Sequence, residues 1–133
     1  MARFSLVRDF MTTHVRKLPL DLNILRAVQI LSDDEISGAP VVDTHGRLVG
    51  MLTERDCMRV VLDAAYHGMP GGLVKDYMSS NPETVSPDET LVKLAQLFIE
   101  RHFRRFPVVE NGRLIGIISR RDVMRAIKEH YPK

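Results

Sequence analysis

The sequence predicts an α+β fold made of two β-α-β-β-α repeats. Residues 7–11 read V-R-D-F-M and residues 74–78 read V-K-D-Y-M, 67 residues further along (74 minus 7). A longer pair of motifs, G-R-L-V-G-M-L-T-E-R-D from Gly46 and G-R-L-I-G-I-I-S-R-R-D from Gly112, lies 66 residues apart (112 minus 46). Two copies of one unit therefore make up nearly the whole chain, and a binding site is expected between the copies or once in each.

Composition excludes several classes of protein. At 133 residues, 44% hydrophobic and 27% charged, the chain suits one compact soluble domain, and no apolar run approaches the ~20 residues that span a bilayer. No secretory signal is recognisable, so a cytoplasmic protein without membrane contact is expected. The lone Cys57 and the scattered His residues lack zinc-site spacing, so no metal is predicted. A net charge of +2 does not demand a nucleic acid.

The first copy, residues 1–67, opens with a short helical lead-in that ends at Met11 and continues with an extended piece at Lys17-Leu18. Asp21 is the expected N-cap of the next helix, because an Asp side chain accepts hydrogen bonds from first-turn amides. Apolar residues at helical spacing predict the inner face of this helix: Ile24, Leu25, Val28 and Leu31.

A β-hairpin is predicted next. Its strands are Ala39–Val42 and Leu48–Leu52, and Asp43-Thr44-His45-Gly46 forms the turn between them. Thr53 opens the last helix of the copy. Helical spacing predicts the inner side of that helix: Cys57, Val60, Val61 and Ala64.

Residues 68–72, rich in Gly and Pro, form the predicted linker to the second copy, residues 73–133. The second hairpin has the turn Glu110-Asn111-Gly112, one residue shorter than the first, which explains the change of offset. The other elements repeat in order: Glu83–Val85 extended, Asp88 as cap, a helix with Leu91, Leu94, Ala95 and Phe98 inside, strands Phe106–Val109 and Leu114–Ile118, and Ser119 at the last helix.

Both copies carry G-x-x-[T/S]-x-x-D where the second hairpin strand meets the last helix: Gly50, Thr53 and Asp56, then Gly116, Ser119 and Asp122. A Thr or Ser cap with an acid three residues on is a capping box, which needs no ligand. The start of a helix also suits an anion, and an Arg inside each motif adds a phosphate donor. An Asp can accept hydrogen bonds from ribose hydroxyls. Both interpretations stay open, although a capping box gives no role to the Arg.

With the strands A-P-V-V from Ala39 and F-P-V-V from Phe106, these motifs resemble the cystathionine β-synthase (CBS) repeat, found in tandem as a Bateman module. The resemblance covers residues from about 7 to 131. It implies two repeats packed through their sheets with pseudo-twofold symmetry. It also implies a regulatory protein, not an enzyme, whose two clefts bind an adenosine-containing ligand: AMP, ADP or ATP, in some members S-adenosylmethionine or a dinucleotide such as NAD. Such modules often form homodimers.

The resemblance also implies roles for individual residues. Asp56 and Asp122 would bind ribose, and the phosphate contacts would be Thr53, Arg55, Ser119 and Arg121. Members of the family often carry basic residues before the strand Pro. The second copy has Arg104 and Arg105 there, which would meet phosphate, and the first has Ser37 and Gly38, so the clefts are expected to be unequal. Gly38 is also counted among the ligand-binding residues. The backbone and apolar side chains that would hold adenine belong to Leu18, Ala39, Pro40, Leu52, Val85, Phe106, Pro107 and Ile118. A place in the core is the alternative for all eight, and it suits Leu52 and Ile118 at least equally well.

Two other functions stay open. One is a structural dimerisation module with vestigial clefts. The other is a nucleic-acid-binding protein, because R-H-F-R-R-F at residues 101–106 interleaves basic and aromatic side chains, although its Phe residues also suit a core. No nucleophile motif, metal set or carboxylate pair indicates an enzyme. The client protein that a regulatory module would control is not encoded in any motif.

Overall fold

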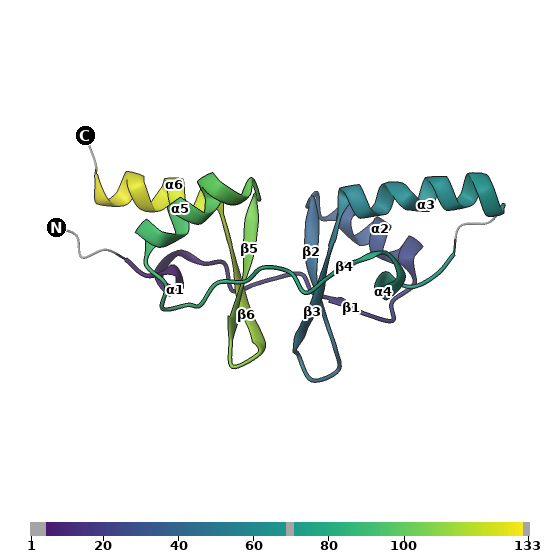
Figure 1. Ribbon diagram of the computed structural model, residues 1–133, viewed down its shortest axis with the longest axis horizontal. Coiled ribbons are helices and arrows are strands. Elements are labelled where there is room, and N and C mark those ends of the chain that lie inside the picture. The colour runs from purple at the N-terminus through teal and green to yellow at the C-terminus, as the bar shows by residue number, and fades with distance from the viewer. Residues whose placement is uncertain (1–4, 69–70, 132–133) are drawn as a thin grey trace. The chain divides into compact units, whose positions relative to one another are not determined.

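The computed structural model describes residues 5–68 and 71–131, so Met69 and Pro70 of the predicted linker lie outside the described residues. The described chain forms two compact units. Unit I comprises residues 16–68 and 71–82, and unit II comprises residues 5–15 together with 83–131. Both units combine helices with strands, as Figure 1 shows, which confirms the predicted α+β class. No helix among the described residues is long and apolar enough to cross a membrane.

Unit I is built on a four-stranded sheet with the strand order β1-β2-β3-β4. The central strands, β2 (Gly38–Val42) and β3 (Leu48–Thr53), form the predicted antiparallel hairpin. β1 (Leu18–Pro19) pairs parallel with β2, and β4 (Ser79–Ser80) pairs antiparallel with β3. The helices of this unit are α2 (Ile24–Asp33), α3 (Glu54–His67) and α4 (Val74–Tyr77).

Unit II repeats this arrangement around the antiparallel hairpin of β5 (Arg105–Glu110) and β6 (Arg113–Ser119). Single bridges take the places of the outer strands: Val85 pairs parallel with Val108, and Thr12 pairs antiparallel with Ile117. The helices are α1 (Val7–Phe10), α5 (Leu91–Arg101) and α6 (Arg120–His130), and Figure 1 shows α5 and α6 beside the end of the hairpin remote from its turn.

The compact units do not coincide with the sequence repeats 1–67 and 73–133, because the two copies exchange their lead-in segments. The Val7 amide in α1 donates to the Glu89 carbonyl at 2.8 Å, and the Val74 amide in α4 donates to the Leu22 carbonyl at 2.8 Å. Each lead-in then supplies the outer partner of the other copy's hairpin: Thr12 for β6, and β4 for β3. The exchange depends on pairing between distant segments, so local patterns do not reveal it.

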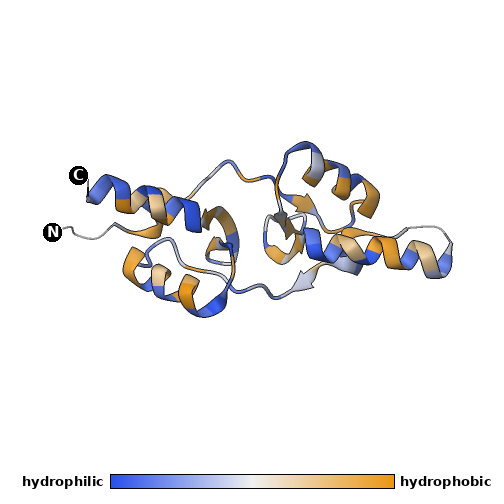
Figure 2. Ribbon diagram, turned by 90° about the horizontal axis from the view of Figure 1, so that it is seen from above, coloured by the Kyte–Doolittle hydropathy of each residue, from blue (hydrophilic) through white to orange (hydrophobic). Residues whose placement is uncertain are grey.

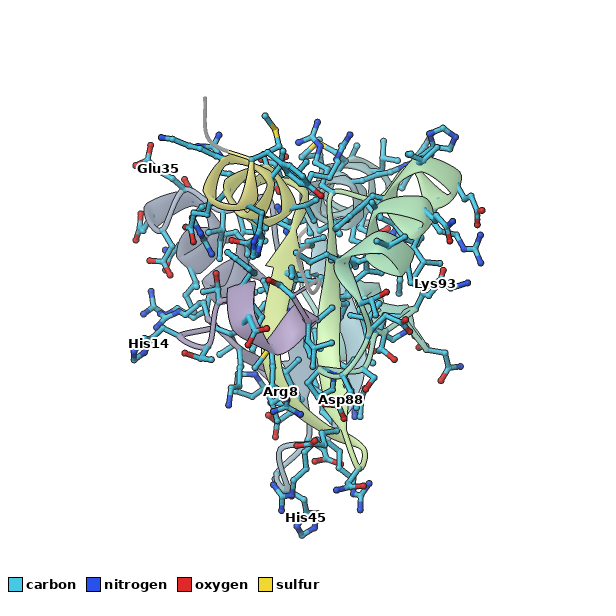
Figure 3. The ribbon with its side chains drawn as sticks, turned by 90° about the vertical axis from the view of Figure 1, so that its left-hand side faces the viewer. Arg8, His14, Glu35, His45, Asp88 and Lys93 are labelled. Carbon is cyan, nitrogen blue, oxygen red and sulfur yellow. The ribbon has the colours of Figure 1, made fainter. Side chains whose placement is uncertain are left out.

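Two predicted helix caps are wrong. Asn23, not Asp21, caps α2, because its Oδ1 accepts from the Leu25 amide at 2.8 Å and α2 begins only at Ile24. Thr90, not Asp88, caps α5, where its Oγ1 accepts from the Lys93 amide at 3.2 Å. The Asp88 carboxylate instead accepts from Arg8 Nη2 at 2.5 Å, and Figure 3 shows these two side chains together. Asp88 thus helps to hold the lead-in of the first copy on unit II.

Each unit has its own hydrophobic core under amphipathic helices, whose apolar and polar residues are distinguished in Figure 2. Most of the predicted inner faces are confirmed, but Leu25 is 43% exposed and Val61 is 65% exposed. The core of unit I contains Leu18, Ile24, Ala27, Ile30, Leu31, Ala39, Val41, Leu52, Cys57, Val60, Val74 and Tyr77. The core of unit II contains Val7, Phe10, Val85, Leu94, Phe98, Phe106, Val108, Ile118 and Ala126.

Candidate functional site

A capping box joins the hairpin to the following helix in each unit. In unit I, Thr53 donates to Asp56 Oδ2 from its amide at 2.9 Å and from its hydroxyl at 3.1 Å, and the Asp56 amide donates to Thr53 Oγ1 at 3.3 Å. In unit II, Ser119 and Asp122 make the same three hydrogen bonds at 2.8, 3.1 and 3.2 Å. The capping-box interpretation is therefore confirmed, and each Asp carboxylate is held in a defined position.

The first turn of each helix offers fewer amides to an anion than the sequence suggests. The Glu54 amide donates to the Ser37 carbonyl at 2.9 Å, and the Arg120 amide donates to the Arg104 carbonyl at 3.1 Å. The amides of Asp56 and Asp122 are used in the capping boxes. Of the first three helical positions, only the second, Arg55 or Arg121, keeps an amide for a ligand.

The arginines of the two motifs are open to solvent. Arg55 and Arg121 are exposed, and within the described ranges neither side chain makes a hydrogen bond or an ion pair. At the start of β5, Arg104 is exposed and Arg105 is half-buried. Each junction therefore places a hydroxyl, a held carboxylate and an exposed guanidinium within four residues of sequence, and these groups suit ribose hydroxyls and phosphate oxygens.

The two carboxylates are not equivalent. Asp56 is partly exposed, and among the described residues its carboxylate makes hydrogen bonds with Thr53 alone. Asp122 is only 5% exposed, and its Oδ1 accepts from Arg125 Nη1 at 3.2 Å. Sequence reasoning assigned no role to Arg125 or to Arg59, its counterpart 66 residues earlier (125 minus 59), although the pair Met-Arg recurs in both copies.

The predicted adenine contacts have buried side chains. Leu18, Ala39 and Leu52 belong to the core of unit I, and the core of unit II holds the other three apolar ones: Val85, Phe106 and Ile118. Gly38, Pro40 and Pro107 are also buried. The core interpretation, which the sequence left open, thus describes the six apolar side chains. Contact between these six residues and adenine stays a prediction. Because their side chains are buried, their backbone groups would have to make that contact.

Unit I has a hollow of about 650 Å³ between α2 and α3. Its lining comprises Val28, Leu31, Ser32, Ile36, Glu54, Arg55, Cys57 and Met58. In unit II the equivalent region contains three packed rings, since Phe106 lies 4.9 Å from Phe98 and 5.7 Å from Phe103 between ring centroids. The residues 67 positions earlier are Leu31, Ile36 and Ala39, which have smaller side chains, and Leu31 and Ile36 line the hollow of unit I.

The side chains at the junctions indicate neither a nucleophilic thiol nor a metal site. Cys57 lies at the hollow, and burial raises the pKa of its thiol, with the nearby charges of Asp56 and Glu54 acting in the same direction. This thiol stays protonated near neutral pH and is a poor nucleophile. No cluster of three or more His, Cys, Asp or Glu side chains suited to a metal ion occurs within the described part of the chain.

Comparison with known proteins extends this description. The chain is 31% identical over 121 residues to the uncharacterized protein MJ1225 of Methanocaldococcus jannaschii, a match that covers 91% of this chain but only 42% of that protein. It is 32% identical over 120 residues to the CBS domain-containing protein YhcV of Bacillus subtilis, covering 90% of this chain and 83% of YhcV. Some relatives are thus much longer than this chain.

Solved structures share the fold. The solved chain of CBSX2 in complex with AMP superposes with a TM-score of 0.84 at 30% identity, covering 94% of this chain and 97% of that solved chain. The CBS domain pair of protein MJ0100, in complex with 5'-methylthioadenosine and S-adenosylmethionine, superposes with a TM-score of 0.78 at 26% identity, covering 96% of this chain and 98% of that one.

The chain matches the CBS domain family twice, over residues 7–63 and 74–129. These ranges agree with the two copies seen in the sequence, including the lead-in segments that the units exchange. The chain therefore belongs to the CBS domain family and carries a tandem pair of CBS domains.

Proposed function

We propose that this protein is a regulatory module that binds an adenosine-containing ligand at its strand-to-helix junctions. The observation that carries the proposal is the repeated junction itself, in which a capping box holds an Asp carboxylate beside an exposed Arg that has no partner within the described residues. Solved relatives bound to AMP, and to 5'-methylthioadenosine with S-adenosylmethionine, support the ligand class. The groups at the junctions bind rather than react, so the proposed role is sensing and not catalysis.

AMP is the first ligand to test, because one phosphate matches the single Arg and the single remaining amide of each junction. ADP, ATP, S-adenosylmethionine and NAD share the adenosine part and remain in the proposal. The first junction is the stronger candidate for ribose, since Asp56 is partly exposed and Asp122 is nearly buried.

A thermal-melt panel tests the ligand class. AMP at about 100 times its dissociation constant stabilises a folded protein by about 2.7 kcal/mol. For a chain of this size, this corresponds to a rise in the melting midpoint of roughly 10 °C. We expect a clearly smaller rise with AMP in Asp56→Ala, because the ribose at the first junction would lose its carboxylate partner while the second junction keeps Asp122.

The matched control is Asp21→Ala, which removes an exposed Asp that caps no helix and should leave the AMP-induced rise unchanged. Equal loss of the rise in both variants would contradict a role of Asp56 in binding. No rise with any adenosine ligand would favour a structural dimerisation module. A rise with an oligonucleotide alone, lost steeply with added salt, would favour the nucleic-acid alternative.

We also propose that two copies of the chain associate through their helices. Large apolar side chains are exposed on α3 and α6, including Val61 at 65%, Met124 at 68% and Ile127 at 53%. Several large apolar side chains exposed on one helix favour a protein interface over scattered surface residues. Light scattering should then give twice the chain mass of 15.2 kDa for the natural protein. The double variant Val61→Glu, Met124→Glu should give a single chain mass.

The control for this measurement is His45→Glu at the tip of the first hairpin, which Figure 3 labels. Figure 1 shows α3 beside the other end of this hairpin, remote from the turn. The control variant should keep the mass of the natural protein. A single chain mass for the natural protein at micromolar concentration would contradict the association.

A further inference from the structure

Arg125 joins two parts of unit II that lie far apart in the sequence. Its Nη1 donates to Asp122 Oδ1 at 3.2 Å, and its Nη2 donates to the Phe10 carbonyl at the end of α1 at 2.9 Å. The guanidinium also lies 5.8 Å from the centroid of the Phe10 ring. One side chain therefore contacts both the carboxylate of the second junction and the lead-in helix.

The bridge also covers the carboxylate. The side chain of Asp122 is 8% exposed, whereas that of Arg125 is 48% exposed, so Arg125 lies on the solvent side of the pair. The other oxygen, Oδ2, is already used by the amide and the hydroxyl of Ser119. A ribose hydroxyl that donates to Oδ1 must therefore share or displace the Arg125 contact.

Unit I provides an internal comparison. Arg59, the counterpart of Arg125, donates to the Tyr77 carbonyl at the end of α4 and lies 5.4 Å from the Tyr77 ring centroid. Within the described residues, however, the Asp56 carboxylate bonds to Thr53 and makes no ion pair with Arg59. Both lead-in helices are held by an Arg, but only in unit II does this Arg also contact the junction carboxylate.

We propose that Arg125 couples the second junction to the N-terminal lead-in. A ligand whose ribose hydroxyls bind Asp122 draws that carboxylate away from Arg125, weakens its hold on the Phe10 carbonyl and loosens residues 7–12. Asp56 has no such connection to α4, so the two junctions differ in function: the first binds, and the second binds and signals to α1. This inference rests on the proposed adenosine function for its ligand step, but the connection between Asp122 and α1 is testable without ligand.

The ligand-free experiment measures amide hydrogen exchange of residues 7–12, where the Met11 amide donates to the Val7 carbonyl and the Thr12 amide to the Ile117 carbonyl. Arg125→Met keeps an apolar stem but removes both hydrogen bonds, and exchange should rise about tenfold. Asp122→Asn should raise it about threefold, because the neutral amide attracts the guanidinium less. The double variant should exceed Arg125→Met very little, since Arg125 carries the connection.

The equivalent substitutions in unit I are the matched controls. Arg59→Met should speed exchange at residues 74–80, whereas Asp56→Asn should leave those residues unchanged. Asp56→Asn alters a capping box just as Asp122→Asn does, so it separates loss of the cap from loss of the coupling. Arg125→Lys is a second variant in case Arg125→Met folds poorly, because a single ammonium cannot hold both partners in the same geometry.

The ligand experiment uses Asp56→Asn as the background, so that AMP binding reports the second junction. Adding Arg125→Met should tighten AMP binding about threefold by calorimetry, because the ribose no longer competes with the guanidinium. AMP should speed exchange at residues 7–12 only where Arg125 is present.

The outcomes separate this proposal from the proposed function. If Asp122→Asn leaves exchange at residues 7–12 unchanged, or if the double variant is simply additive, the coupling is wrong whatever the ligand. If AMP binds but Arg125→Met does not change its affinity, the ligand step of the coupling is wrong. If the exchange results hold and no adenosine ligand binds, the connection between Asp122 and α1 stands and the adenosine function is wrong.

Discussion

Phe106→Ala is expected to lower the free energy of unfolding by about 3–5 kcal/mol, the usual loss for a fully buried Phe. The Phe106 side chain has no exposed surface and packs against Phe98 and Phe103, with ring centroids 4.9 and 5.7 Å away. Truncation removes buried apolar surface and leaves a cavity. The neighbouring rings cannot readily fill it, because Phe98 belongs to α5 and Phe103 follows directly after the C-cap of this helix. Urea denaturation followed by circular dichroism measures the loss.

Phe103→Ala is the matched control, because this ring belongs to the same cluster but is 46% exposed. We expect a loss of about 1 kcal/mol for it. Equal losses in the two variants would show that the cluster repacks to fill the space left by the Phe106 ring. The natural counterpart of Phe106→Ala is Ala39 in unit I, where the smaller side chains accompany the hollow of about 650 Å³.

The elements of each copy could be predicted because their signals are local. Short apolar runs around a Gly-containing turn predict the hairpin strands, and both turns place their Gly at a φ of 79°. An Asp three residues after Thr53 and after Ser119 predicts a capping box at each junction, and the structure forms both.

The helix caps at residues 23 and 90 show the limit of local signals. Asp21 and Asn23 are both good caps, as are Asp88 and Thr90, and the choice depends on where tertiary contacts start the helix. Asp88 is drawn to Arg8 of the lead-in, a contact between residues 80 positions apart. No pattern within one copy contains that information.

The candidate site was predicted by residue type but not by environment. Asp56 and Asp122 have the same motif around them, yet one is partly exposed and the other is nearly buried beneath Arg125. Both lead-ins hold an Arg through a backbone carbonyl, but of the two only Arg125 also donates to the junction carboxylate in the described residues. Likewise, Leu52 and Ile118 suit either a core or a ligand contact, and only packing shows that their side chains lie in the core.

Gly50→Ala is expected to lower the free energy of unfolding by about 3 kcal/mol, because the site has no room for a methyl group. A Cβ on Gly50 would lie 2.5 Å from Met78 Sδ and 2.8 Å from the Ser79 carbonyl oxygen. The Met side chain can rotate away, but the carbonyl belongs to β4, which is held against β3 by the pairing of Met51 with Ser79 and of Gly50 with Ser80. Urea denaturation again measures the loss.

Gly71→Ala is the matched control for the loss of glycine flexibility, since a Cβ there meets nothing within 4 Å. It should change stability by less than about 0.5 kcal/mol. A similarly small change in Gly50→Ala would mean that β4 does not lie against β3 and that the exchange of lead-ins is wrong for unit I.

The same crowding recurs at Gly116, where a Cβ would lie 2.8 Å from Met11 Sδ and 2.9 Å from the Thr12 carbonyl oxygen. The glycine that opens G-x-x-[T/S]-x-x-D therefore admits the lead-in of the other copy, whereas the Thr or Ser and the Asp cap the helix. If Gly50→Ala destabilises the protein while AMP still raises its melting midpoint, then the motif combines two separable roles: its first residue serves the exchanged fold, and its last serves the ligand.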